Sequence, residues 1–222
     1  GLLLVSGPKS AEAVAAAFGI EVRALQLLHT LPATIGGQQA LILRTEETGE
    51  QDFEVLLPAD AVPAAWNQLM TSGAPFGIKP VGAQARELLR IEAGLPKAGP
   101  DLNEEIVPPE ANLEGKAFSL SKGCYPGQEV VARMDTYGNV RRHLVGLIIQ
   151  DKTVPPAGSK LFSGDREVGW VSSAVFSPQR NAALAFGFPL RDFSAPDTTL
   201  TVEVAGTRHQ ATVHALPFQK HS

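Results

Sequence analysis

Cys124 is the only cysteine among the 222 residues, and it lies in the segment SKGCYPGQEVVAR (residues 121–133). Lys122 lies two residues before the thiol, and a short helix is predicted over Pro126–Asp135. A nearby cation and a helix N-terminus both favour the thiolate, which is the reactive form of cysteine. A free cysteine is also commonly a small buried apolar side chain. The local pattern therefore leaves both a functional thiol and a structural one open.

Glu92 is the second position at which the residue type and its spacing suggest chemistry. The segment Val81–Ala93 has the periodicity of a helix, and at about 100° per residue Glu92 falls within the apolar stripe around Leu88. Arg86 and Arg90 fall on the opposite side of the same helix. A carboxylate on an apolar face is costly unless a partner satisfies it. That partner is either a buried salt bridge or a ligand with paired N–H donors, such as the amino-pyrimidine edge of a pterin.

The composition excludes several classes of protein. A net charge of −4 and a pI near 5.8 give no electrostatic footprint for nucleic acid or an anionic membrane. One cysteine cannot form an internal disulfide, so we expect a reducing, cytoplasmic location. The sequence holds no apolar run near the roughly 20 residues of a membrane helix. The five histidines lack metal-site spacing, so no metal is expected, and the phosphate-loop and serine-hydrolase motifs are absent.

The first part of the chain alternates between strand and helix signals. The first expected elements are a strand over Leu2–Val5 and a helix over Ala11–Phe18. Three strand-like stretches follow, which are Ile20–Leu28, Ala40–Arg44 and Phe53–Leu57. A second helix is expected over Ala61–Met70, and a short strand after it. Ser10 is the expected cap of the first helix and Gly36-Gly37 an expected turn. This order predicts a ferredoxin-like split βαβ arrangement and the α+β class.

The second part of the chain reads differently. A long Pro/Gly/Asn-rich loop, Leu95–Gly115, follows the Glu92 helix, and loops of this length are usually functional. After Gly138, six short strands separated by turns predict a small antiparallel β-barrel or β-sandwich, of which we expect the barrel. We therefore predict a boundary near residue 139, with an α+β domain over residues 1–139 and a barrel domain over residues 140–222.

The segment KGCYPGQE (Lys122–Glu129) resembles the K-G-C-Y-x-G-Q-E signature of the YgfZ-type folate-binding proteins. These are relatives of the aminomethyltransferase T-protein of the glycine cleavage system. The segments RTEETGEQDFEV (Arg44–Val55) and RIEAGLP (Arg90–Pro96) are similar to stretches that both groups share. The segment EVGWVSSAVFSPQRNAALAF is similar to the C-terminal T-protein barrel, so the resemblance covers nearly the whole chain.

The resemblance implies tetrahydrofolate, or a derivative of it, as the cofactor. Glu92 then corresponds to the glutamate that holds the pterin, and Cys124 corresponds to the thiol that the YgfZ type needs for function. The remaining candidate folate-binding residues are Lys122, Tyr125, Gln128 and Arg133. The resemblance also implies that the N-terminal part of the family fold is missing from this chain, together with an aspartate used in T-protein catalysis.

Three functions remain in competition. The first is a folate-binding accessory protein that supports iron–sulfur enzymes or their assembly factors, including enzymes of tRNA modification, without being a classical enzyme. The second is an aminomethyltransferase that moves a one-carbon unit from an aminomethyl carrier to tetrahydrofolate. The third is a non-catalytic interaction module that uses the barrel and the long loop. Neither a direct nucleic-acid partner nor a membrane is expected for any of them.

Overall fold

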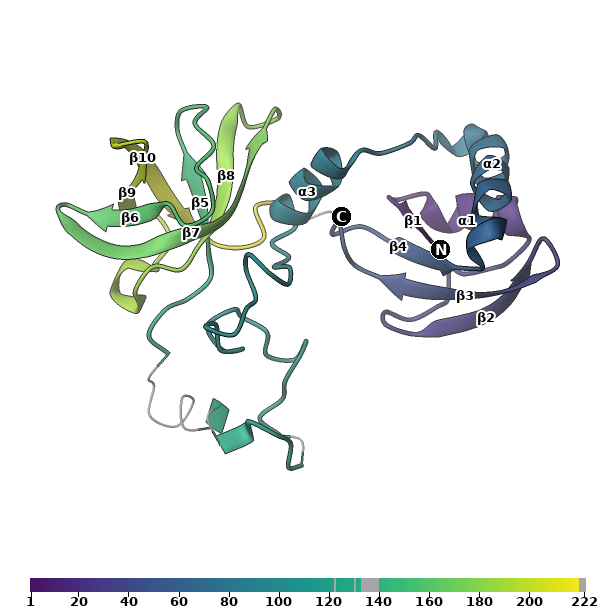
Figure 1. The fold of residues 1–222 in the computed structure, drawn as a ribbon, viewed down its shortest axis with the longest axis horizontal. Coiled ribbons are helices and arrows are strands. Elements are labelled where there is room, and N and C mark those ends of the chain that lie inside the picture. Colours follow the sequence, from purple (N-terminus) through teal and green to yellow (C-terminus); the bar gives the residue numbers. More distant parts are fainter. Residues whose placement is uncertain (122, 130, 133–139, 220–222) are drawn as a thin grey trace. The chain divides into compact units, whose positions relative to one another are not determined.

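The computed structural model describes residues 1–121, 123–129, 131–132 and 140–219. The chain forms two compact units, the first comprising Gly1–Leu89 and the second running from Arg90 to the end of the described residues (Figure 1). Within the described part of the chain, no helix is long and apolar enough to cross a membrane.

The first unit is a four-stranded sheet with two helices. Its elements are β1 (Leu2–Ser6), α1 (Ser10–Phe18), β2 (Thr30–Ile35), β3 (Gln38–Thr45), β4 (Asp52–Leu56) and α2 (Val62–Ser72). The strand order is β1-β4-β3-β2, and all neighbouring strands are antiparallel. β1 and β3 therefore run parallel with β4 between them, and α1 joins β1 to β2, the antiparallel strand at the other edge of the sheet.

Alternation along the strands directs one face of this sheet to a core. Val5, Ile42 and Phe53 point to the same side and pack with apolar residues of α1 and α2. The next residues along these strands point to the opposite face, where Leu56 remains 39% exposed. Gly36 and Gly37 both have positive φ and form the two-residue hairpin between β2 and β3. The predicted turn is thus confirmed.

The second unit contains a closed antiparallel barrel of six strands. They are β5 (Val145–Ile149), β6 (Lys160–Ser163), β7 (Arg166–Ser177), β8 (Ala182–Gly187), β9 (Thr199–Val204) and β10 (Thr207–His214). They close in the order β10-β5-β8-β7-β6-β9. β8 is buried along its whole length, because Ala183 and Ala185 face the barrel interior while Leu184 and Phe186 pack with Ile91 outside the wall. This outer layer anchors the end of α3 (Ala83–Glu92).

The predicted α+β class and C-terminal barrel are confirmed, and four local predictions are wrong. Ser10 is the first residue of α1 rather than its cap, and its hydroxyl donates to the Gln51 carbonyl at 2.5 Å. Ile20–Leu28 forms turns rather than a strand, and β2 begins only at Thr30. The second helix is followed by a 3₁₀ turn over Ala74–Phe76, not by a short strand. Val81 lies outside α3 and is 63% exposed. In these three segments the residue pattern is compatible with a strand or a helix, but turns form there instead.

Two predictions on the organisation of the chain stay predictions. Of the helix predicted over Pro126–Asp135, residues 128–129 and 131–132 are helical, and the remainder from residue 133 lies outside the described residues. The predicted domain boundary near residue 139 is likewise left as a prediction.

Candidate functional site

Glu92 is the last residue of α3, and a glycine turn fixes where that helix ends. Gly94 has a φ of 73°, and the Gly94 and Leu95 amides donate to the carbonyls of Ile91 and Arg90 at 3.0 and 3.1 Å. This pair of bonds is the Schellman motif, which needs a left-handed residue after the helix. A Cβ on Gly94 would also lie 3.1 Å from Leu216. Glycine is therefore required here for both conformation and space.

The Glu92 carboxylate is buried, with 5% of the residue exposed. Ser177, the last residue of β7, donates its hydroxyl to Glu92 Oε1 at 2.8 Å. The Glu92 carbonyl accepts the amides of Phe218 and Gln219 at 2.9 and 3.2 Å. Strand β7 and the C-terminal segment thus hold the end of α3 from two sides. Among the described residues, the single serine hydroxyl leaves most of the carboxylate's acceptor capacity unused.

A charged network directly beside Glu92 was missed by the sequence analysis. Arg90 Nη1 pairs with Asp101 Oδ2 at 2.9 Å, and Asp101 is fully buried. Ser172 and Ser173 of β7 donate to the other oxygen, Oδ1, at 2.6 and 2.7 Å. The Lys97 amide also donates to Oδ2, at 3.1 Å. Every oxygen of this buried carboxylate has donors, so the network fastens the long loop and α3 to the barrel wall.

Arg90 falls on the side of the helix opposite the apolar stripe around Leu88, yet it is buried. Only 8% of Arg90 is exposed, and its guanidinium lies 5.3 Å from the centroid of the Phe186 ring. Helical periodicity assigned Arg90 to the side away from Leu88. The barrel wall, which comes much later in the sequence, covers that side near the helix end. The ion pair could have been suspected from the sequence, because Arg90 lies in the R-x-E-A-G segment and Asp101 lies in the loop that follows it.

The segment Arg44–Val55 in the first unit has a structural role. Asp52 is fully buried and its Oδ2 accepts the amides of Glu47 and Thr48 at 2.6 and 2.7 Å. The Thr48 hydroxyl donates to Asp52 Oδ1 at 2.8 Å. Glu54 lies on the sheet face away from α1 and α2, where burial and then the Glu47 carboxyl raise its pKa, while the charge of Arg86 in α3 lowers it in part. This segment therefore builds a tight turn and an acidic pair.

The cysteine motif lies on the surface of the second unit. Cys124 is exposed, Tyr125 and Gln128 are half-buried, and Gly127 has a φ of 86°. The predicted site residues Lys122 and Arg133 lie outside the described residues. Within the described chain, Glu92 makes its side-chain hydrogen bond to Ser177 alone, so no hydrogen bond joins it to the cysteine motif.

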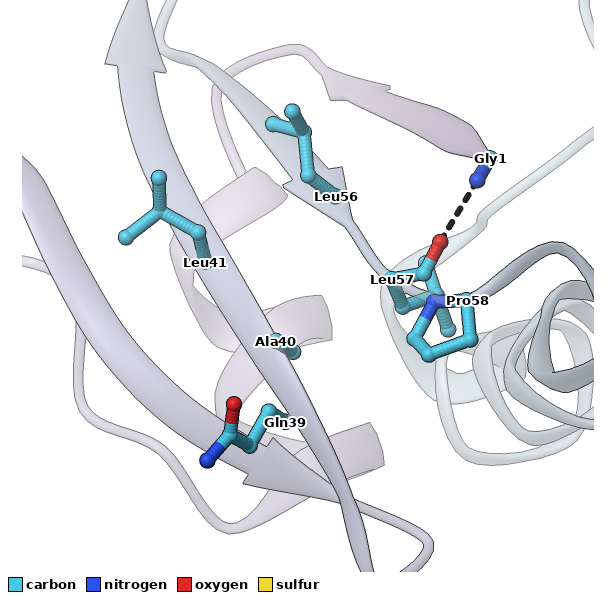
Figure 2. A pocket seen from close by; sticks show the side chains of 7 residues that line it. All are labelled: Gly1, Gln39, Ala40, Leu41, Leu56, Leu57 and Pro58. Atoms are coloured by element: carbon cyan, nitrogen blue, oxygen red, sulfur yellow. Dashed lines mark hydrogen bonds between the residues drawn. The ribbon is translucent and has the colours of Figure 1, made fainter.

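A shallow hollow lies on the uncovered sheet face of the first unit. It has a volume of about 430 Å³, and its lining residues are Gly1, Gln39, Ala40, Leu41, Leu56, Leu57 and Pro58. Figure 2 shows Leu41 and Leu56 on adjacent strands, where they are directly paired. None of the predicted site residues lines this hollow. Among the described residues, no group of three His, Cys, Asp or Glu side chains could hold a metal ion.

Two family models match the chain. The GCVT N-terminal domain matches residues 1–120, and the glycine cleavage T-protein C-terminal barrel domain matches residues 142–220. The cysteine motif therefore lies between the two matched regions. This division is consistent with the α+β and barrel parts of the fold.

Relatives and a solved structure agree with the family models. The chain is 34% identical to an aminomethyltransferase of Saccharopolyspora erythraea over 99% of its own length and 60% of the relative. An aminomethyltransferase of Chlorobium limicola is 35% identical over 82% of the chain and 50% of the relative. The chain thus spans 60% or less of the length of these curated relatives. The crystal structure of glycine cleavage system aminomethyltransferase T from Bartonella henselae has a TM-score of 0.74 at 20% identity, covering 99% of this chain and 84% of that one.

Proposed function

The chain belongs to the glycine cleavage T-protein family, and from this premise we propose that it binds tetrahydrofolate with Glu92 as the pterin anchor. The observation that carries the proposal is the buried carboxylate at the end of α3, which has 5% exposure and one serine partner. Burying a carboxylate with so few donors is unfavourable, so a ligand that supplies more donors stabilises it.

The pterin edge has the chemistry that this carboxylate lacks. Its amino group and neighbouring ring N–H form two parallel donors, which match a carboxylate in a bidentate, charge-assisted pair. Ser177 fixes one oxygen of Glu92, and the Schellman turn at Gly94 fixes the backbone. A pre-positioned acceptor loses little conformational entropy on binding, which favours affinity.

We further propose that the protein acts as a folate-dependent accessory factor for iron–sulfur enzymes, with Cys124 as its functional thiol. The K-G-C-Y-x-G-Q-E resemblance supports this role over others. The exposure of Cys124 also supports it, because a thiol that reacts with a partner must be accessible. The partners would be iron–sulfur enzymes or their assembly factors, including those of tRNA modification, in the reducing cytoplasm.

Aminomethyl transfer to tetrahydrofolate is the second candidate. It is favoured by relatives named aminomethyltransferase that are 34 and 35% identical to this chain. Both candidates share the folate site at Glu92 and differ in the use of Cys124. An assay of methylenetetrahydrofolate formation from an aminomethylated lipoyl carrier separates them, since turnover that survives Cys124→Ser supports the transferase.

The primary test is calorimetric titration of the chain with tetrahydrofolate, in parallel with Glu92→Gln. Glutamine keeps the shape and can still accept from Ser177, but it loses the charge. We expect affinity to fall about tenfold or more, as for a charge-assisted bond. Glu104→Gln is the matched control, because Glu104 is exposed in the loop after α3. Equal affinity of the folded Glu92→Gln variant and the parent would refute the anchor.

A genetic test addresses the accessory role. Cys124→Ser should fail to complement a strain that lacks its YgfZ-type protein, while retaining tetrahydrofolate affinity. Full complementation by this variant would exclude a functional thiol without affecting the folate proposal.

A further inference from the structure

The second unit contains a cavity, and Glu92 is not among its lining residues. We call it the loop cavity; its volume is about 360 Å³. Its apolar lining residues are Pro109, Phe118, Leu120, Val131 and Val140, and its polar ones are Asn112, Glu114 and His143. Pockets of 300–1,000 Å³ with mostly apolar walls and a few polar groups are typical small-molecule sites.

Hydrogen bonds fix the loop segment that lines the loop cavity. The Asn112 side chain donates to the Leu144 carbonyl at 2.8 Å, and the Leu144 amide donates to the Glu110 carbonyl at 2.7 Å. The Gly115 amide bonds the Phe118 carbonyl at 2.9 Å, which closes the loop on itself. The wall is therefore built by a folded loop that is tied to the start of β5. Such a wall cannot collapse into the cavity without losing these bonds.

The polar groups select the kind of ligand. Among the described residues, the Glu114 carboxylate has no hydrogen-bond or ion-pair partner, so it is available to a donor. Burial and the charge of Arg191 lower the pKa of His143, and Glu110 opposes them only in part. The imidazole is then neutral at neutral pH and does not repel a cation. The flat faces of Phe118 and His143 suit offset stacking with a planar ring.

We propose that the loop cavity binds a planar organic ring of one or two cycles that carries an amino or amidine group. The ring packs among Phe118, Val131 and Val140, and its amino edge pairs with Glu114. Leu120 and Val131 lie four residues before and seven residues after Cys124 in the sequence. The proposal does not depend on folate, because neither Glu92 nor Ser177 lines this cavity.

The test is an NMR titration of the ¹⁵N-labelled chain with 2-aminobenzimidazole at neutral pH. A ring of this size is expected to bind with a dissociation constant on the order of 1 mM. Glu114→Gln should weaken binding about threefold, because Glu114 is exposed and solvent screens its charge-assisted pair. Glu104→Gln, an exposed change in the same loop, should leave the affinity unchanged.

A second variant tests the apolar part of the site. Val140→Trp fills the cavity and should abolish binding, whereas Val154→Trp, at a 42% exposed position outside it, should not. If Val140→Trp disturbs the spectrum of the free protein, Leu120→Trp replaces it, since Leu120 is 37% exposed and tolerates a larger side chain. Absence of binding to the parent, or unchanged affinity in Glu114→Gln and the filled variant, would overturn the proposal. Displacement of the probe by tetrahydrofolate would show that the loop cavity is not a site separate from the folate site, and would overturn that part of the proposal.

Discussion

Replacing Asp101 with alanine should destabilise the second unit more than any other single charge removal discussed above. The substitution leaves the Arg90 guanidinium, which is 8% exposed, without its partner at 2.9 Å. The hydroxyls of Ser172 and Ser173 lose their acceptor at the same time. Breaking a buried ion pair from one side costs about 3–5 kcal/mol, and orphaned hydroxyls add to that cost rather than offset it.

The unfolding of the second unit can be followed through one fluorophore. The chain has two tryptophans, Trp66 in the first unit and Trp170 in the second. In a Trp66→Phe background, urea unfolding monitored by Trp170 reports the second unit alone. In thermal unfolding of the same variants, a loss of 3–5 kcal/mol corresponds to a fall in melting temperature of roughly 10–20 °C for a unit of this size.

Two companion variants make the result interpretable. Asp165→Ala removes a fully exposed carboxylate whose contact with Arg208 is 3.3 Å, and it should leave stability nearly unchanged because solvent screens that contact. Asp101→Asn keeps an acceptor for the serines but loses the charge, so it should fall between the two. If Asp101→Ala costs less than about 1 kcal/mol, the network does not hold the loop to the barrel and our reasoning is refuted.

Three further outcomes follow from the geometry. Gly94→Ala should cost about 1–3 kcal/mol in urea unfolding because its Cβ meets Leu216 at 3.1 Å, and more than Gly99→Ala, which has positive φ but open space; equal costs would contradict the packing argument. Burial and the adjacent carboxyl raise the pKa of Glu54, so its protonated form is favoured by folding and the benefit is lost as pH rises through the folded pKa. Glu54→Gln should therefore stabilise the first unit at neutral pH, with the gain vanishing below the ordinary glutamate pKa; a gain that grows in acid would contradict this. Burial lowers the pKa of His143, so the second unit should lose stability as pH falls below about 6.5, and His143→Gln should flatten that profile; an unchanged slope would exclude His143 as its source.

Much of the fold could be predicted because its signals are local. Six strands of the barrel show short apolar runs bounded by turn residues, and the hairpin glycines 36 and 37 mark their turn directly. The helix that ends at Gly19 was equally clear, since a glycine with φ 67° is the common helix stop. By contrast, Ile20–Leu28 is apolar enough for a strand but has no neighbouring strand to pair with. Val22 instead belongs to the first core and Ile20 and Leu25 pack against it, whereas Leu27 and Leu28 are exposed.

The burial of Glu92 could be predicted, whereas its surroundings could not. Helical periodicity needs only residues three or four apart, so it placed the carboxylate on an apolar face. Ser177 lies 85 residues later and Asp101 pairs with serines 71 and 72 residues away, so these contacts depend on how the barrel closes. No local pattern carries that information. The cysteine motif is a third case. Its resemblance to a family signature suggested a functional thiol, and the structure adds that Cys124 is exposed.

The two buried carboxylates at the end of α3 have different environments, and that difference supports the roles that we propose for them. Asp101 is saturated by an arginine, two serines and an amide, so it has no remaining need for a ligand. Glu92 has a single serine, although it is almost as buried. Arg90 is two residues before Glu92 and is held by Asp101, so the saturated carboxylate fixes the helix end that presents the unsaturated one. Tetrahydrofolate affinity should therefore fall in Asp101→Asn even though Asp101 touches no ligand, and the loss should be absent in a background that already carries Glu92→Gln. Equal losses in both backgrounds would mean that Asp101 acts on the fold alone and not through Glu92.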